Sequence, residues 1–342
     1  MRFIQVGVGG FGGVWANVLK NDRRAKVVGL VDINPAALKA VCEKHGYDES
    51  ICFQSLEEAL KNVEADALVC ATPPKLHRAP VVAALRAGLH VISEKPMAES
   101  MADCKAMLTA ARKAKRHYVV SQNYRYQDIM YTIADLVQKG AIGTIGQVKI
   151  DFFKGVNFDG FRAEMPYPLL IDMSIHHFDL IRFLTGLDPI SVRGSAWNPS
   201  WSHYAGDCSS AIVFDMTDEV RVLYNASWCA KGDYSDWSGN WQIEGSKGTI
   251  VYERGKAVLH TIPEGYSPTK TKEIKPRKMR KEAQAFVLNN FIKAIKEGER
   301  PLTDVYDNIK SVAMVFAAVK AVKTERKVAV IDAGVEELIG DK

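Results

Sequence analysis

Three side chains that can hold or move a proton have helical spacing: Asp172, His176 and Asp179. At about 100° per residue, they share one stripe of a helix near 168–185 with Phe183. The opposite stripe carries four apolar residues and the neighbouring histidine: Leu170, Met173, His177, Leu180 and Leu184. Two carboxylates on its face can fix the tautomer of His176 and raise its basicity, so His176 is a candidate general base.

The two adjacent histidines therefore point in different directions. The apolar neighbours of His177 predict a packed, hydrogen-bonded core histidine. A metal site made of Asp172, His176 and Asp179 is an alternative, but the sequence shows no further ligands for it. We therefore expect no metal.

A glycine motif stands near the start of the chain. Gly7, Gly9 and Gly12 form G-x-G-x-x-G directly after a strand-like run and before the helix-like segment FGGVWANVLK. In a dinucleotide-binding unit these glycines allow the tight turn, the approach of the pyrophosphate and close helix packing. The helix N-terminus then faces the phosphates. We expect the whole turn, including Gly10 and Phe11, to bind a cofactor.

The second predicted strand ends in Asp32, about 20 residues after the last glycine of the motif, as expected of an acid that binds the adenosine ribose. A 2′-phosphate there would meet a like charge, and Ile33 and Asn34 supply no basic group. The sequence therefore favours NAD over NADP.

Two further segments follow predicted strands. Ala71-Thr72-Pro73-Pro74, with His77, comes after one strand, and Glu94-Lys95-Pro96 comes after the next. Open α/β sheets bind ligands at the carboxyl ends of their strands. Both segments are therefore candidate parts of a binding site, although His77 could equally be a polar group near a helix start.

The first part of the chain alternates short apolar runs with segments of helical period, which indicates a parallel sheet covered by helices on both faces. The predicted strands are 2–8, 26–32, 66–71, 89–93 and 117–121. Ser55 with Glu58, and Ser100 with Asp103, have the spacing of capping boxes that open helices. The sequence predicts an α/β, doubly wound Rossmann domain over residues 1–122.

From about residue 145 the apolar period changes to two, in the runs IGQVKIDFF, CSSAIVFDM, VRVLYNASW and GTIVYE. This alternation is typical of antiparallel strands with one solvated face. Two amphipathic helices near 281–297 and 303–323 close the chain. We expect residues 123–342 to form an α+β domain for substrate binding and oligomerisation, with a large open, mostly antiparallel sheet. Its last helices could pack back on the Rossmann domain, and its open sheet favours a homodimer or homotetramer.

Composition excludes several classes of protein. The 342 residues, 47% hydrophobic and 25% charged, suit two globular domains. We expect no membrane span and no secretory signal, because long uncharged apolar runs are lacking. The six cysteines form no C-x-x-C pair, which fits a reducing cytoplasm. The basic strip 270–281 lacks interleaved aromatics, so we expect a solvated connector and no nucleic-acid binding.

In this order and spacing, the glycine motif, the two strand-end segments and the Asp172-x-x-x-His176 helix resemble the glucose-fructose oxidoreductase and inositol dehydrogenase (Gfo/Idh/MocA) family. The resemblance covers nearly the whole chain, including Asn123-Tyr124-Arg125 and the closing TDVYDNIKSVAMVFAAV helix. Ser174 is a departure, because many relatives carry glycine there, and we expect it to be tolerated.

The resemblance implies a pyridine-nucleotide dehydrogenase acting on a sugar or cyclitol hydroxyl. It places Lys95, Asp172 and His176 at the reacting carbon. It also implies that Glu94 contacts the nicotinamide ribose. The other cofactor contacts expected outside the glycine turn are Thr72, Pro73, His77, Lys95 and Arg125.

Oxidising a secondary alcohol requires a base, a hydride acceptor and positive charge near the developing alkoxide. His176 can be the base, and Lys95 can hydrogen-bond the same oxygen and lower its pKa. Asp172 can keep both oriented.

The polyol or sugar itself is not identified by the sequence. Besides Lys95, Asp172 and His176, we expect Tyr124, Asn157 and Asp179 to contact it. Other aromatic and acidic residues of the second domain suit polyhydroxylated rings, although aromatics in sheets are more often core residues: Trp197, Trp201, Tyr204, Trp228, Trp237, Trp241, Asp159 and Asp207. Two alternatives remain, a glycoside-cleaving enzyme that uses NAD without net redox change and a non-enzymatic nucleotide or sugar sensor.

Overall fold

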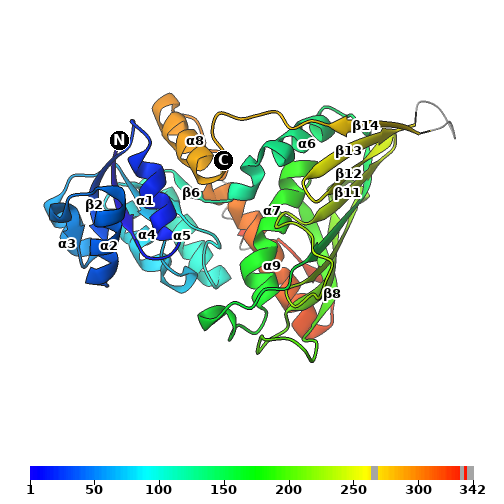
Figure 1. Cartoon of the computed structure of the whole chain (residues 1–342), viewed down its shortest axis with the longest axis horizontal. Helices are drawn as coiled ribbons and strands as arrows, with labels where there is room; N and C mark the ends of the chain where they lie inside the picture. The colour runs from blue at the N-terminus through cyan, green and yellow to red at the C-terminus, as the bar shows by residue number, and fades with distance from the viewer. Residues whose placement is uncertain (263–268, 332–334, 337–342) are drawn as a thin grey trace. The chain divides into compact units, whose positions relative to one another are not determined.

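The computed structural model describes residues 1–262, 269–331 and 335–336. These residues form two compact units, and Figure 1 traces the chain through them. The first unit contains Met1–Asn123 and Lys281–Ile309, and the second contains the described residues of Tyr124–Arg280 and Lys310–Glu336. The chain therefore passes from the first unit to the second, returns to the first at Lys281, and enters the second again at Lys310.

The first unit has a parallel sheet of six strands in the order β3-β2-β1-β4-β5-β6. Its strands are β1 (Arg2–Val6), β2 (Lys26–Val31), β3 (Cys52–Phe53), β4 (Ala67–Cys70), β5 (His90–Ser93) and β6 (Tyr118–Val120). Its helices are α1 (Gly12–Lys20), α2 (Pro35–His45), α3 (Leu56–Asn62), α4 (Arg78–Arg86), α5 (Met101–Ala114) and α8 (Ala283–Glu297). The predicted doubly wound fold is confirmed, and the two-residue β3 is the one strand of this sheet that the sequence pattern missed.

Both serines cap helices at the positions that the sequence predicts. The Ser55 hydroxyl accepts the Glu58 amide at 3.2 Å, and the Ser100 hydroxyl accepts the Asp103 amide at 3.1 Å. Each bond satisfies a first-turn N–H that has no partner within the helix. Helix α3 and helix α5 therefore begin where the serines stand.

Helix α8 joins the core of the first unit although it lies far along the chain. Phe291 is fully buried, with its ring centroid 6.4 Å from that of Phe3 on β1. At the start of the returning segment, Lys281 forms an ion pair of 2.6 Å with the buried carboxylate of Asp22. Apolar packing and this ion pair attach the returning segment to the unit.

The second unit is built on a nine-stranded sheet in the order β14-β13-β12-β11-β7-β10-β9-β8-β15. Its strands are β7 (Ile145–Phe153), β8 (Pro189–Trp197), β9 (Ser209–Met216), β10 (Arg221–Ser227), β11 (Asn240–Gly245), β12 (Gly248–Glu253), β13 (Lys256–Thr261), β14 (Lys270–Ile274) and β15 (Val328–Ala329). Neighbouring strands are antiparallel except β7 and β10, which are parallel. The four strands read from period-two runs all form, and the large, mostly antiparallel sheet is confirmed.

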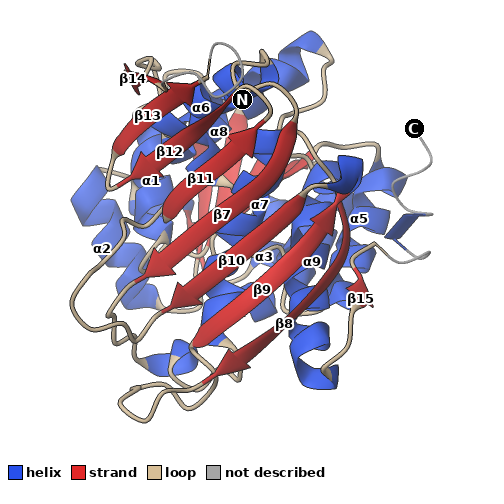
Figure 2. Ribbon diagram, turned by 90° about the vertical axis from the view of Figure 1, so that its right-hand side faces the viewer, coloured by secondary structure: helices blue, strands red, loops and turns tan. Residues whose placement is uncertain are grey.

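Helix α7 (Ser174–Thr185) packs on one face of this sheet, and α6 (Asp128–Gln138) and most of α9 (Val305–Thr324) belong to the same unit. Phe178 of α7 lies edge-on to Phe214 and Tyr224 of the sheet, with ring centroids 4.8 and 5.1 Å apart. In Figure 2 the other face is turned toward the viewer, and no helix in the described part of this unit crosses it.

That open face is largely polar. On β10 its exposed residues are Arg221, Leu223 and Asn225, and on β7 they are Gln147 and Lys149. Leu223 is 38% exposed. A contact between two copies of this face would therefore consist mainly of polar groups with a few apolar ones. The open face is not a broad apolar patch, so exposed apolar area alone does not predict a partner.

The basic strip is partly regular structure. Its first half is strand β14, and its second half leads to α8. The Met279 amide donates to Asp128 at 2.8 Å, so the connector is held on α6. Among the described residues, no helix is long and apolar enough to cross a membrane.

Candidate active site

The glycine turn of the first unit lies between β1 and α1. Gly7 has φ +84°, and a Cβ there would lie 2.8 Å from the Ala71 carbonyl carbon. A Cβ on Gly12 would collide with the Gly7 carbonyl oxygen. A Cβ on Gly9 would project into open space instead. Close packing therefore requires glycine at positions 7 and 12. At Gly9 the absence of a side chain leaves open space beside the backbone, which suits a cofactor diphosphate.

The start of α1 is suited to an anion. No side chain caps it, and its first turn contains no acidic residue. Phe11, just before the helix, is 51% exposed. The residues present at the turn thus fit the phosphates of a dinucleotide.

Gln5 holds the turn from below, and the motif does not reveal it. Its side-chain amide is fully buried and donates to the carbonyls of Gly7 at 3.0 Å and Gly12 at 2.7 Å. One side chain thereby ties the two ends of the motif together. In the sequence, the sign of this role is a polar residue between the apolar residues of the first strand.

Asp32 stands beside the glycine turn, at the end of β2. One carboxylate oxygen accepts the amide of Val8 and the other accepts the amide of Asn34, both at 3.0 Å. The side chain is partly exposed, and each oxygen keeps a lone pair for a further donor. Ile33, which follows, is 86% exposed and brings no positive charge.

The segments after β4 and β5 are joined by His77. Its imidazole is fully buried, with Nε2 2.7 Å from the Thr72 carbonyl oxygen and Nδ1 3.1 Å from that of Met97. Burial lowers the pKa of His77. His77 therefore joins the Thr72–Pro73 segment to the segment after Pro96, and its contacts are structural.

Glu94 and Lys95 follow β5. The Glu94 carboxylate is 7% exposed and accepts the indole N–H of Trp15 at 2.7 Å. It also accepts the Lys95 backbone amide at 3.2 Å. Burial raises the pKa of Glu94. Within the first unit, the predicted cofactor residues Gly9, Asp32, Thr72 and Glu94 thus all follow carboxyl ends of parallel strands.

In the second unit, the Asp172 segment is not a regular α-helix. Residues Leu169–Met173 form a π-helical turn, followed by α7. The Ser174 hydroxyl donates to the Leu169 carbonyl at 3.1 Å and lies 2.9 Å from the Tyr224 hydroxyl. Turns of this kind are frequent at functional sites. The serine that departs from the family pattern is accommodated, because its hydroxyl is bonded on both sides.

Asp172 is paired with Arg162, a residue that the sequence motifs did not single out. The guanidinium Nε donates to the carboxylate at 2.8 Å, and the Asp172 side chain is 8% exposed. Phe158 and Phe161 flank Arg162, with ring centroids 5.4 and 4.6 Å from its guanidinium carbon. The arginine orients the Asp172 carboxylate.

His176 is buried and stacks on Tyr124. The two rings are 4.0 Å apart between centroids, at 13°. His176 is 5% exposed. Burial raises the pKa of Tyr124, so its hydroxyl stays neutral. Of the residues expected at the substrate, the second unit therefore brings Tyr124 directly against His176.

His177 is the packed histidine that the sequence predicts. It is fully buried, with Nδ1 2.9 Å from the Tyr224 hydroxyl and Nε2 3.1 Å from the Trp237 carbonyl oxygen. Burial lowers its pKa to about 4. The expectation of a hydrogen-bonded core histidine is confirmed.

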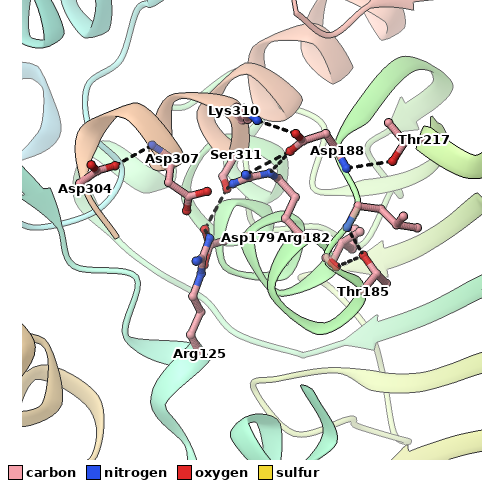
Figure 3. A network of polar contacts seen from close by, with 12 residues as sticks. Arg125, Asp179, Arg182, Thr185, Asp188, Thr217, Asp304, Asp307, Lys310 and Ser311 are labelled. Carbon is pink, nitrogen blue, oxygen red and sulfur yellow. Dashed lines mark hydrogen bonds and ion pairs between the residues drawn. The ribbon is translucent and has the colours of Figure 1, made fainter. Parts of the chain in front are cut away.

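Asp179 and Arg125 bind each other, as Figure 3 shows. The guanidinium donates to both carboxylate oxygens, at 2.5 and 2.6 Å, and both side chains are buried. The Ser311 hydroxyl adds a third bond to Asp179 at 2.8 Å and accepts Arg182 at 3.0 Å. These contacts fix the Asp179 carboxylate in place, and the substrate role expected of Asp179 stays a prediction. The same ion pair holds Arg125, and the cofactor role expected of Arg125 stays a prediction.

The remaining substrate candidates divide by exposure. Asn157 is exposed, and Trp237 is 39% exposed, with the Lys154 ammonium 5.4 Å from its ring centroid. Trp228 and Trp241 are buried core residues.

Within the described ranges, no three of the His, Cys, Asp and Glu side chains lie close enough together to hold a metal ion. At this helix, Asp172 and Asp179 each form an ion pair with an arginine, Arg162 and Arg125, so both carboxylates already have a cationic partner.

Comparisons with known proteins agree over most of the chain. The profile of an oxidoreductase family with an NAD-binding Rossmann fold matches residues 1–122, and that of the GFO/IDH/MocA C-terminal domain matches residues 130–251. An uncharacterised protein of Sinorhizobium fredii is 30% identical, with 96% of this chain and 95% of that protein covered. Inositol 2-dehydrogenase of Rhizobium meliloti is 26% identical, with 96% and 99% covered.

Among solved structures, an oxidoreductase from Agrobacterium radiobacter, crystallised with NAD⁺, L-tartaric acid and magnesium, shares this fold. Its TM-score is 0.86 at 22% identity, with 96% of this chain and 98% of that chain covered. The fold, both domain profiles and the full-length relatives lead to one assignment. The chain belongs to the Gfo/Idh/MocA family of oxidoreductases.

Proposed function

We propose that the protein is an NAD-dependent dehydrogenase that acts on a secondary hydroxyl of a sugar, sugar derivative or cyclitol. The observation that carries the proposal is the buried His176, stacked on Tyr124 and close in sequence to the ion-paired Asp172. A buried imidazole with a fixed ring plane is suited to take a hydroxyl proton. The inositol 2-dehydrogenase relative supports a cyclitol or related polyol as the substrate.

The cofactor residues proposed are Gly7, Gly9, Gly10, Phe11 and Gly12 at the diphosphate, with Asp32 at the adenosine ribose. Thr72, Pro73 and Glu94 would line the nicotinamide half. Bound NAD supplies the hydride acceptor. Asp32 favours NAD because its carboxylate is fixed by two backbone amides and would repel a 2′-phosphate.

In the oxidation, His176 removes the proton of the substrate hydroxyl. Lys95 donates a hydrogen bond to the same oxygen and stabilises its negative charge as the C–H bond breaks. Asp172, whose carboxylate is held by Arg162, is the proposed orienting acid for His176. The oxidation leaves a ketone and a protonated His176, and bound NAD would take up the hydride. In the reverse direction His176 returns the proton.

The decisive experiment is a screen of inositols, sugars and other polyols for reduction of NAD, with NADP in parallel. We expect NADH to accumulate with at least one cyclitol or sugar, and turnover to require His176. A glycoside-cleaving enzyme would release product without accumulating NADH, and a sensor would bind without turnover. Either result would replace the proposal.

Asp32→Ala tests the cofactor assignment. The variant should lose affinity for NAD and gain relative affinity for NADP, because the ribose acceptor and the repulsion disappear together. Dissociation constants measured by calorimetry report the change. Equal or tighter NADP binding by the unaltered protein would overturn the preference.

We further propose a cytoplasmic homodimer or homotetramer. All six cysteines are free thiols, which suits a reducing compartment. The open face of the nine-stranded sheet is the proposed contact surface.

A further inference from the structure

We infer that Trp15 is a positioning residue of the reaction: its indole N–H fixes the Glu94 carboxylate in the orientation that receives the nicotinamide-side ribose. This inference rests on the proposed function, since it takes NAD as the cofactor. Neither the glycine motif nor the Glu94-Lys95-Pro96 segment includes Trp15. Its role follows from one buried contact between them.

The contact has a single possible direction. An indole N–H only donates and an ionised carboxylate only accepts. Nε1 of Trp15 lies 2.7 Å from Oε1 of Glu94, Trp15 is fully buried, and Glu94 is 7% exposed. The other oxygen, Oε2, accepts the Lys95 amide at 3.2 Å. With one donor on each oxygen, the plane of the carboxylate is set while further lone pairs remain for ribose hydroxyls.

The contact also connects two parts of the cofactor site. Trp15 lies on α1, three residues after Gly12, and α1 begins at the glycine turn. Glu94 follows β5, directly before Lys95. The helix proposed to face the diphosphate and the segment that carries Lys95 are therefore joined by one hydrogen bond. A shift of α1 would move the acceptor for the ribose with it.

The charge of Glu94 depends on the same contact. Burial raises its pKa, and the Trp15 N–H opposes that rise, as do the ammonium and backbone amide of Lys95. The Ser121 hydroxyl lies near the carboxylate but outside hydrogen-bonding geometry. The Cys70 thiol, at the end of the adjacent β4, has a pKa of about 11 and stays neutral. Loss of the indole donor would therefore raise the pKa of Glu94 further and favour its protonated form.

Trp15→Phe tests the inference, because it removes the donor and keeps an aromatic ring. Dissociation constants for NAD and for AMP are measured by calorimetry from pH 6 to pH 9. AMP lacks the nicotinamide-side ribose and reports only the adenosine half. We expect NAD to bind about 10-fold more weakly at pH 7 and AMP to bind as before. The loss of NAD affinity should shrink as the pH rises, because a higher pH favours the ionised form of Glu94.

Tyr118→Phe is the matched control. It removes a buried hydroxyl that lies 2.9 Å from the Ser93 hydroxyl, next to Glu94, but it leaves both donors to the carboxylate. It should bind NAD as the wild type does. Trp15→Leu, which also lacks a donor, is the second variant if the phenylalanine variant does not fold, and it should show the same selective loss.

Three outcomes would overturn the inference: wild-type NAD affinity in both Trp15 variants, an equal loss of AMP, or an equal loss in Tyr118→Phe. A loss of NAD affinity that is the same at pH 6 and pH 9 would overturn the part of it that concerns the charge of Glu94. If the wild type binds AMP but not NAD, the proposed function fails, which is a distinct result.

Discussion

Acid should destabilise this protein through His177. The imidazole is fully buried against Tyr224 and the Trp237 carbonyl, and burial lowers its pKa to about 4. In the unfolded chain its pKa is about 6.5. As the pH falls, the unfolded chain therefore binds the proton before the folded protein does. The stability that His177 contributes is complete above about pH 6.5 and is lost as the pH falls toward about 4.

The size of the effect follows from those two pKa values. Between pH 7.5 and pH 4.5, the linkage relation gives a loss of about 2.5 kcal/mol of unfolding free energy from this residue. His177→Ala removes the titration, but it also leaves a cavity and deprives the Trp237 carbonyl of its partner. That truncation costs about 2 to 4 kcal/mol at pH 7.5. The stability gap between wild type and variant should therefore nearly close at pH 4.5.

Urea unfolding at four pH values between 7.5 and 4.5 measures the gap directly. The difference in unfolding free energy between wild type and variant cancels the contributions of the other groups that titrate in this pH range. His203→Ala is the control, because His203 is partly exposed, with its Nε2 3.4 Å from Asp159. A gap for His177→Ala that stays constant with pH, or widens in acid, would refute the reasoning.

Three other sites carry further expectations. His176→Ala should lower turnover by about 100-fold or more while the NAD affinity of the folded variant stays near that of the wild type; retained turnover would remove His176 as the base. Asp179→Asn leaves the buried Arg125 without its charge partner and should cost about 3 to 5 kcal/mol, seen as a lower melting temperature. Unchanged melting with lost substrate affinity would support the substrate role instead. Sedimentation should show a dimer or tetramer, which Leu223→Arg on the open face shifts toward monomer; a wild-type monomer at micromolar concentration would contradict the proposed interface.

Local patterns were sufficient to predict the type of each sheet, but not every strand in it. Apolar runs without alternation located the parallel strands, and serine spacing located the starts of α3 and α5. Strands β8, β11, β13, β14 and β15 were not predicted, and several of them lie on the outer part of the second sheet. Strand β14 (Lys270–Ile274), for example, has four exposed residues out of five. It lies at the edge of the sheet and pairs with a neighbour on one side only. Because so few of its residues are buried, its sequence lacks the apolar alternation that would predict a strand.

Residues that position the site were harder to find than residues that belong to motifs. Gln5, Trp15 and Arg162 act through contacts with residues that are 7, 79 and 10 positions away in the chain. Spacing along one element cannot show such partners. Gln5 and Trp15 are buried whereas Arg162 is partly exposed, and only the fold reveals which group each of them contacts.

The helix of Asp172 and His176 shows which contacts a helical periodicity cannot predict. The stripe that joins Asp172, His176 and Asp179 assumes a regular α-helix, but Leu169–Met173 is a π-helical turn, which changes the angular relation of Asp172 to the residues after it. Asp179 lies within regular α7, yet its oxygens are bound by Arg125 and by Ser311 of α9. Two carboxylates that look equivalent on a helical wheel are thus held by different arginines from different parts of the chain. Arg162 is 33% exposed and Arg125 is 7% exposed, so solvent reaches the arginine that holds Asp172 and barely reaches the one that holds Asp179.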